Sequence, residues 1–324
     1  MIDRRSLLGA AAALSAFDKA SAAVAAVPPP PSRLAWRDPA RDRVVPVLIR
    51  CPATLAGDAG LAPMVVLSHG LGGTREGLAY LGEALAEAGY VAVHLQHPGS
   101  DAAIWQGAPD MRSAMGSALM NPGAAVARLG DVVFALDHVL AGGEPLLRGL
   151  VDPERIAAAG HSYGAWTVSH VLGERLPLGG WGLDLPDPRL RAGIELSPIP
   201  PLPIPVFGVP AAVSFTGISA PILHVTGTLD SGMGAPDWRA RTVGFRTATS
   251  PGVLAVLDGA AHASFAGEAK IGGRWNDPTY QPRVARLCRL FLDAELRDDQ
   301  AARGKLLRGA GLGPRDTLES KGFA

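Results

Sequence analysis

The sequence predicts an α/β protein in which one mostly parallel central sheet is covered by helices on both faces. Short apolar runs of strand length alternate along the chain with amphipathic segments whose apolar residues recur every three or four positions. Several of these runs are apolar almost throughout, as strands buried on both faces of a parallel sheet are. Strands and helices that alternate in this way build a single parallel-rich sheet.

Strands are expected where apolar residues cluster between turn residues. The run Pro63-Met64-Val65-Val66-Leu67-Ser68 stops at His69-Gly70 and has the length and composition of a fully buried strand. The other expected strands span residues 43–50, 90–95, 155–160, 191–196, 221–226 and 252–257.

Helices are expected between these strands. From Thr74, leucines at positions 78, 81 and 85 mark one face of a helix that ends at Gly89. A second helix begins after Pro122, a third covers residues 166–172, and a late helix is lined by Val284, Leu287, Phe291 and Leu292. The segments 98–121 and 197–210 are expected to be irregular, and irregular stretches of this length often shape a functional site.

Composition excludes several classes of protein. The 324 residues include 30 basic and 30 acidic side chains, so no net charge is available to hold nucleic acid or an anionic membrane. Hydrophobic residues make up 48% of the chain, which is enough to build a core and excludes global disorder. Cys51 and Cys288 stand far apart without metal-ligand spacing, so we expect two buried thiols and no metal or other cofactor; in an exported chain they could also pair.

The first 27 residues resemble a signal peptide. Arg4-Arg5 precede Leu7-Leu8 and an Ala-rich apolar run that ends in small residues near Ala22, a layout typical of twin-arginine export. The apolar run is too short to span a membrane, which needs about 20 residues. Residues 28–32 then form a proline-rich spacer. Export to the periplasm or medium is therefore expected, and the alternative is an Ala-rich helix that stays attached to a cytoplasmic protein.

Gly160-His161-Ser162-Tyr163-Gly164 matches the GxSxG pattern of a strained turn that lifts a serine hydroxyl clear of a sheet. In a chain with 40 glycines the bare pattern is weak. Its context is strong, because an expected strand precedes it and an expected helix follows it. Ser162 is therefore the candidate nucleophile.

A serine hydroxyl needs a histidine to take its proton and a carboxylate to orient that histidine. Asp230 and His262 follow two later expected strands, in the order that this serine turn predicts. The carboxyl ends of parallel strands meet at one edge of a sheet, so Ser162, Asp230 and His262 can meet there.

Other residues compete for these roles. Glu195 lies near the end of the strand before Asp230, and Asp184 and Asp187 are nearby loop carboxylates. Of the other histidines, His224 is expected in the core, while His97 and His161 are expected to make structural hydrogen bonds.

The oxyanion of a tetrahedral intermediate needs two amide donors. Tyr163 supplies one at a helix N-terminus, and Leu71 in the sequence Ser68-His69-Gly70-Leu71-Gly72-Gly73 supplies the other. This glycine cluster lacks the spacing and the lysine of a phosphate-binding loop, so nucleotide binding is rejected. Trp105, Met111, Met115 and Met120 are expected either to wall an apolar pocket or to belong to the core.

Taken in order, these motifs, together with His97-Pro98-Gly99-Ser100-Asp101, Asp152-Pro153-Glu154-Arg155-Ile156, Thr226-Gly227-Thr228-Leu229-Asp230 and His262-Ala263-Ser264-Phe265, resemble an α/β-hydrolase. The likeness is closest to bacterial platelet-activating-factor acetylhydrolase-like and dienelactone-hydrolase-like serine esterases, with cutinase-like polyesterases as cousins. True dienelactone hydrolases carry a cysteine where Ser162 stands, which argues against dienelactone as substrate. Ala165 also replaces a glycine usual after the serine turn.

The resemblance implies a catalytic domain over residues 33–300, with residues 301–324 as a C-terminal extension. It implies the triad Ser162, Asp230 and His262, the oxyanion amides of Leu71 and Tyr163, and a small or lipid-like ester as substrate. Thioester or amide cleavage by the same triad is the alternative within enzymes. A binding module that has lost catalysis is the alternative outside them, and the oligomeric state is left open.

Overall fold

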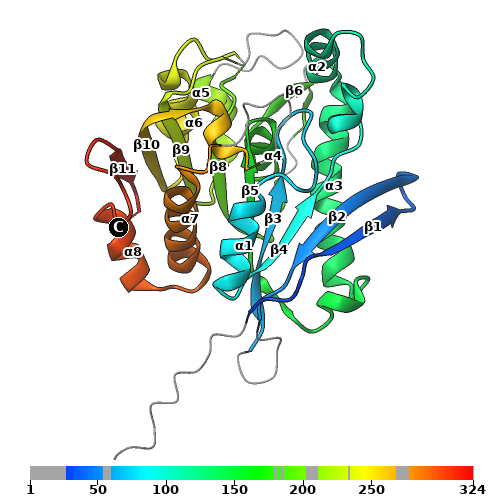
Figure 1. Cartoon of the computed structure of the whole chain (residues 1–324), viewed down its shortest axis with the longest axis horizontal. Helices are drawn as coiled ribbons and strands as arrows, with labels where there is room; N and C mark the ends of the chain where they lie inside the picture. The colour runs from blue at the N-terminus through cyan, green and yellow to red at the C-terminus, as the bar shows by residue number, and fades with distance from the viewer. Residues whose placement is uncertain are drawn as a thin grey trace, which may run out of the picture.

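A single nine-stranded sheet forms the centre of the molecule (Figure 1). The computed structural model describes residues 27–53, 60–178, 181–183, 186–201, 211–232, 234–267 and 277–323. The strands, in their order across the sheet, are β1 (Ser32–Asp38), β2 (Arg43–Arg50), β4 (Val91–Leu95), β3 (Ala62–Ser68), β5 (Val151–His161), β8 (Leu190–Leu196), β9 (Ile222–Leu229), β10 (Gly252–Ala261) and β11 (Thr317–Lys321).

The six inner strands from β4 to β10 pair in parallel, while β1, β2 and β11 pair antiparallel at the two edges. The predicted α/β class with a mostly parallel sheet is therefore confirmed. A small hairpin of β6 (Leu176–Leu178) and β7 (Trp181–Leu183) stands apart from this sheet.

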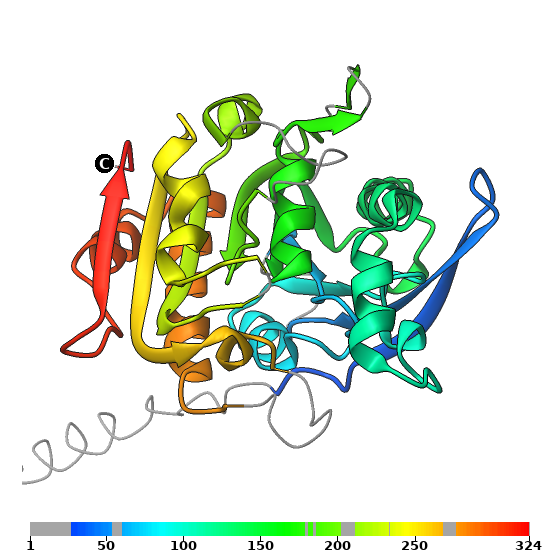
Figure 2. The same ribbon diagram turned by 90° about the horizontal axis from the view of Figure 1, so that it is seen from above.

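Helices cover both faces of the sheet (Figure 2). They are α1 (Ala79–Glu87), α2 (Met111–Leu119), α3 (Pro122–Leu140), α4 (Tyr163–Val171), α5 (Ala211–Ser214), α6 (Val243–Thr247), α7 (Gln281–Leu296) and α8 (Gln300–Leu307).

Side chains alternate along each inner strand, so one strand feeds two separate cores. In β3, Val65 and Leu67 pack in the core with α1, α7 and α8, whereas Met64 and Val66 pack in the core with α3 and α4. All four are buried, which explains why this strand is apolar at every position from 64 to 67.

Several elements differ from the sequence-based expectation. The first helix begins at Ala79 and not at Thr74, because Leu78 has a left-handed backbone (φ 60°) that breaks the helix before it. The segment expected to be irregular contains α2, whose first turn is capped by Asp110 accepting from the Arg112 amide. The edge strand β1 was not expected from the sequence.

The C-terminal residues set apart as an extension belong to the same sheet and core. Strand β11 pairs with β10 in antiparallel register, and Ala302 and Leu306 of α8 are buried against the core that α7 covers. Phe323 stacks on Phe291 with ring centroids 5.6 Å apart. Removing residues 301–324 would expose this apolar surface.

Two other sequence expectations are addressed in part. None of the helices in the described ranges is both long and apolar enough to cross a membrane. Residues 1–26 of the expected signal peptide (residues 1–27), Asp184, and residues 202–210 of the proline-rich segment lie outside the described residues.

Candidate functional site

Ser162 lies in the sharp turn between β5 and α4. Its backbone has φ 55° and ψ −114°, a conformation that residues other than glycine rarely adopt. Its amide donates a hydrogen bond to the Leu196 carbonyl at 2.9 Å. Strain of this kind persists only where the surroundings hold it, and it concentrates at functional sites. The turn sets Ser162 at the carboxyl edge of the sheet.

The two glycines of the motif are required by close backbone contacts. A Cβ atom on Gly164 would lie 1.9 Å from the Ser68 carbonyl oxygen, and a Cβ on Gly160 would lie 2.2 Å from the carbonyl of Gly164. Strand β3, strand β5 and helix α4 can therefore pack this closely only because both residues lack side chains.

Replacing Gly164 with alanine should destabilise the fold by several kcal/mol, or prevent folding, because the clash is with backbone that cannot rotate away. Gly116→Ala is the matched control, since a Cβ at that helical position meets nothing within 4 Å. Thermal unfolding of both variants measures the difference. Equal melting temperatures would contradict the close packing described here.

The structure brings the three residues predicted from the sequence into one hydrogen-bonded chain. His262 Nε2 lies 2.9 Å from Ser162 Oγ, and His262 Nδ1 lies 3.0 Å from Asp230 Oδ1. Asp230 is fully buried, whereas the imidazole keeps 15% of its side chain exposed. The backbone of His262 is also fixed, because its carbonyl accepts a hydrogen bond from His161 Nε2 at 2.9 Å.

Asp230 is surrounded by donors that favour its ionised form. Burial by itself would raise the pKa of Asp230, but hydrogen bonds and charge attraction from His262 and Arg241 hold that pKa below its ordinary value. Thr226 Oγ1 donates to Asp230 Oδ2 at 2.9 Å, and the buried Arg241 Nε lies 2.5 Å from Oδ1. An ionised carboxylate at this position can orient His262 and stabilise its protonated form.

Two residues near this carboxylate escaped the sequence analysis. The Ser197 hydroxyl lies 2.5 Å from His262 Nδ1 and also hydrogen bonds to Asp230. Ser197 directly follows strand β8, so its position at the carboxyl edge of the sheet was a signal that could have found it. Arg241 lies in a short 3₁₀ helix, Trp238–Thr242, after β9, and no sequence pattern pointed to it.

The competing residues have other partners. Glu195 binds Ser169 Oγ at 2.5 Å and His224 Nδ1 at 3.0 Å, and it does not reach His262. Asp187 pairs with Arg189 at 2.5 Å. His224 is buried in the core, as expected.

His97 and His161 make the hydrogen bonds expected of structural residues. His97 binds Asp131 and Ser68 at 3.0 and 3.1 Å, and His161 binds the His262 carbonyl. Burial lowers the pKa of His97 to about 4 and that of His161 to about 3, so both rings are neutral at physiological pH.

The loop that carries Leu71 lies beside Ser162. A Cβ on Gly70 would sit 3.5 Å from the Ser162 Cβ, which places this loop against the serine turn. Leu71 packs with Tyr163 and Ile199, so residues 71 and 163 flank the serine from two different elements. Tyr163 is the first residue of α4, where free backbone amides can bind an anion.

Trp105 and Met115 pack against the same loop. Trp105 Nε1 donates to the Gly72 carbonyl at 2.8 Å, and a Cβ on Gly72 (φ 76°) would lie 2.9 Å from the indole and 3.4 Å from the Met115 methyl. Met111 and Met120, at the two ends of α2, expose 43% and 46% of their surface. Trp105 and Met115 therefore place apolar surface against the loop that carries Leu71.

The described residues show no group of three or more side chains suited to a metal ion. Cys51 and Cys288 are free and buried, and burial raises the pKa of the Cys51 thiol to about 11. Both thiols are therefore protonated at neutral pH and inert.

Glu174 is buried just after helix α4, and its carboxyl makes the stability of the fold depend on pH. Glu174 accepts a hydrogen bond from Ser214 Oγ at 2.9 Å, and burial, with the nearby charge of Glu195, raises the pKa of Glu174 to about 8. In the unfolded chain this carboxyl has its ordinary pKa of 4.5. Between these values the folded state binds the extra proton, so its stability falls as pH rises through the window.

We therefore expect Glu174→Gln to melt at roughly the same temperature as the wild type at pH 5 and about 5 °C or more above it at pH 9, because glutamine does not ionise. The exposed Glu154→Gln is the control. A difference that shrinks as pH rises would contradict this assignment. Calorimetry across the pH range measures it.

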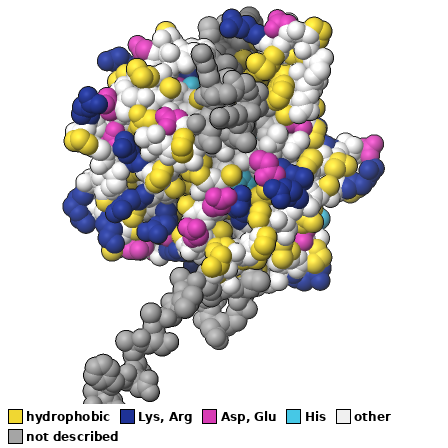
Figure 3. Space-filling view, viewed as in Figure 1, with side chains coloured by type: hydrophobic (Ala, Val, Ile, Leu, Met, Phe, Trp, Pro, Cys, Tyr) yellow, Lys and Arg dark blue, Asp and Glu magenta, His cyan; other side chains and the backbone are white. Residues whose placement is uncertain are grey.

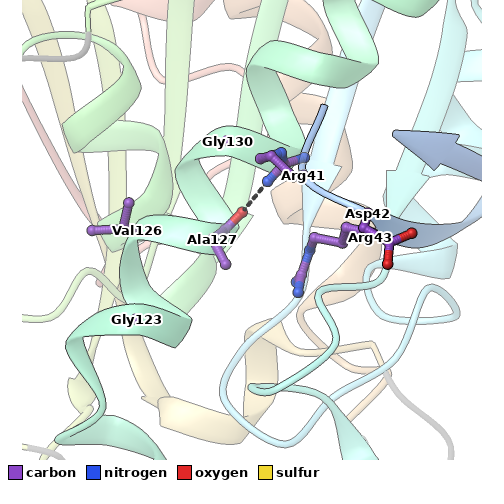
Figure 4. A pocket seen from close by; sticks show the side chains of 7 residues that line it. All are labelled: Arg41, Asp42, Arg43, Gly123, Val126, Ala127 and Gly130. Atoms are coloured by element: carbon purple, nitrogen blue, oxygen red, sulfur yellow. Dashed lines mark hydrogen bonds between the residues drawn. The ribbon is translucent and has the colours of Figure 1, made fainter. Parts of the chain in front are cut away.

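An open pocket of about 430 Å³ lies away from the serine, between the β1–β2 turn and α3 (Figure 4). Its arginines are already engaged: Arg41 donates to the Ala127 carbonyl, and Arg43 binds Asp131 at 2.7 Å. On the face shown in Figure 3, basic, acidic and hydrophobic side chains are interspersed, in keeping with the balanced net charge.

Comparison with known proteins supports the superfamily that the sequence resembles. No family model matches the chain. A curated relative, cutinase est1 of Thermobifida alba, is 27% identical over 149 residues, which cover 43% of this chain and 43% of that protein. The chain thus matches less than half of the relative's length. Together with the mixed α/β fold, this similarity supports the α/β-hydrolase superfamily and does not single out a branch within it.

Proposed function

We propose that the protein is a serine hydrolase that cleaves carboxylic esters through an acyl-enzyme. The observation that carries the proposal is the chain of hydrogen bonds from Ser162 Oγ through His262 to Asp230, set on a strained turn between strand and helix. The similarity to a cutinase supports ester hydrolysis in general terms. The finer likeness to acetylhydrolase-like and dienelactone-hydrolase-like esterases rests on the sequence motifs.

In the proposed mechanism, Ser162 Oγ attacks the ester carbonyl carbon while His262 Nε2 takes the hydroxyl proton. The carbonyl oxygen becomes an oxyanion, which the backbone amides of Leu71 and Tyr163 stabilise. Collapse of this intermediate breaks the bond to the alcohol, which leaves with the proton from His262. A water molecule then gives a proton to His262 and attacks the acyl carbon. When this second intermediate collapses, the bond to Ser162 Oγ breaks, His262 returns the proton to that oxygen, and the acid is released.

A fluorophosphonate probe and a panel of p-nitrophenyl esters from acetyl to palmitoyl test this proposal. We expect the wild type to be labelled once, at Ser162, and to hydrolyse at least part of the panel. A protein that is neither labelled nor active would be a binding module and would overturn the proposal. Faster turnover of thioesters or amides than of matched esters would change the proposed substrate class but not the proposed catalytic triad.

We further propose that the protein is exported, on the strength of Arg4-Arg5 and the small residues near Ala22. N-terminal sequencing of native protein from fractionated cells should find a mature chain that begins shortly after residue 20. Replacing both arginines with lysine should retain the precursor in the cytoplasm. An intact Met1 in the cytoplasmic fraction of wild-type cells would refute export.

A further inference from the structure

Arg128 is a fully buried arginine on α3 that takes no part in the proton relay. All three guanidinium nitrogens donate hydrogen bonds: Nη2 to the His69 carbonyl at 2.6 Å, Nη1 to Ser100 Oγ at 2.9 Å, and Nε to Thr167 Oγ1 at 2.9 Å. Burial lowers the pKa of Arg128 to about 10, so the group stays charged at neutral pH. Removing a charge from water is costly, and apolar residues could fill the same space more cheaply.

The contacts of Arg128 join the two sides of the expected oxyanion hole. On one side, the His69 carbonyl belongs to the loop that carries Leu71. On the other side, Thr167 Oγ1 accepts a hydrogen bond from Arg128 Nε and donates one to the Tyr163 carbonyl at 2.9 Å. The guanidinium carbon also lies 4.6 Å from the centre of the Tyr163 ring. One side chain therefore contacts both elements whose spacing must match the oxyanion.

The same loop is anchored a second time, one helical turn along α3. Asp131 binds His97 Nδ1 at 3.0 Å, His97 Nε2 lies 3.1 Å from Ser68 Oγ, and the His97 amide donates to His69 Nε2 at 3.1 Å. Hydrogen bonds link Ser68, His97 and Asp131 as they link a serine, a histidine and an acid in a catalytic triad, but His97 is fully buried, whereas the His262 side chain is 15% exposed. Their contacts hold the end of β3, from which the loop departs.

Building on the proposed esterase function, we infer that Arg128 is a positioning residue for the oxyanion hole, holding the Leu71 and Tyr163 amides at the separation that the tetrahedral intermediate requires. Donors act on an oxyanion only within about 2.7–3.1 Å, and a displacement of about 1 Å can cost on the order of 10²-fold in rate. Because the ground-state carbonyl carries less charge, the loss should fall on kcat and not on KM.

Arg128→Met and Arg128→Lys test this inference. We expect kcat for a p-nitrophenyl ester to fall by about 10²-fold in the methionine variant, with KM changed by less than about threefold. Lysine keeps the charge but cannot bond three partners in one plane, so we expect a loss of about tenfold. Affinity for a trifluoromethyl ketone, which forms a tetrahedral adduct with the serine, should weaken in parallel with kcat.

Arg297 offers a matched control. Its guanidinium lies 4.1 Å from the centre of the Tyr90 ring and Nη2 donates to the Ala88 and Gly89 carbonyls, as Arg128 contacts a tyrosine ring and a carbonyl. Arg297 is 30% exposed and also pairs with Asp293 at 2.8 Å, so its loss affects stability and not the serine turn. Arg297→Met should lower the melting temperature and leave kcat and ketone affinity unchanged.

The outcomes separate the two claims. If the wild type hydrolyses esters and Arg128→Met keeps wild-type kcat and ketone affinity, the positioning role is wrong and the proposed function stands. If the wild type neither hydrolyses esters nor reacts with fluorophosphonate, both fail. Should the methionine variant not fold, Arg128→Lys decides: wild-type kcat in that variant overturns the inference.

Discussion

Replacing Ser162 with alanine should lower ester turnover by on the order of 10⁴- to 10⁶-fold while the protein stays folded. In the proposed mechanism the Ser162 hydroxyl forms the acyl-enzyme, and alanine fits the same turn without that hydroxyl. The hydroxyl lies 2.9 Å from His262 Nε2, which takes its proton in that mechanism. Steady-state kinetics, with circular dichroism to check the fold, measures the effect.

His262→Ala should cost a similar factor, and the double variant should lose little more than either single one, since the residues act as a unit. Near-wild-type turnover in either single variant would end the assignment of the nucleophile and base. Independent, additive losses would mean that the two side chains do not share one proton relay.

Asp230→Asn should reduce kcat by on the order of 10⁴-fold. The amide keeps the shape of the carboxylate, but it can donate to His262 Nδ1 and so favours the wrong tautomer. It also removes the negative charge that Arg241 and Thr226 hold in place. A pH profile of kcat should show the loss at every pH at which the wild type is active.

Glu195→Gln is the matched variant for this experiment, because it makes the same chemical change in a buried carboxylate that binds Ser169 and His224. We expect it to change stability and to retain most of the wild-type kcat. An inactive Glu195→Gln beside an active Asp230→Asn would show that the acid comes from the end of β8.

The amino-acid sequence alone was enough to predict the parallel core of the fold and the candidate triad. Strands buried on both faces leave continuous apolar runs, and strand β3 carries such a run because its alternate side chains fill two cores. The turn around Ser162 was visible because backbone contacts at Gly160 and Gly164 exclude every side chain. Asp230 and His262 could be placed at the same sheet edge because parallel strands end together.

Edges and connections were harder to predict, because their structure depends on distant partners. Strand β11 is polar along much of its length and becomes a strand only by pairing with β10. Helix α2 is different, because Met111, Met115 and Leu119 recur every four residues, and this period could have predicted the helix. The start of α1 at Ala79 was missed for a different reason, because the spacing of the leucines does not show that Leu78 has a left-handed backbone.

Only the tertiary structure decided which polar side chains surround the candidate site. Asp230, Glu195 and Asp187 all lie near strand ends in the sequence, and the choice among them depends on side-chain distances across the sheet. Ser197 comes from just after β8, Arg241 from the 3₁₀ helix Trp238–Thr242 and Arg128 from α3, and no motif links them to Ser162. Hydrogen bonds act over about 3 Å in space and are independent of separation along the chain, so a sequence can nominate the strand ends that carry reactive groups, but it cannot specify which buried donors will hold them.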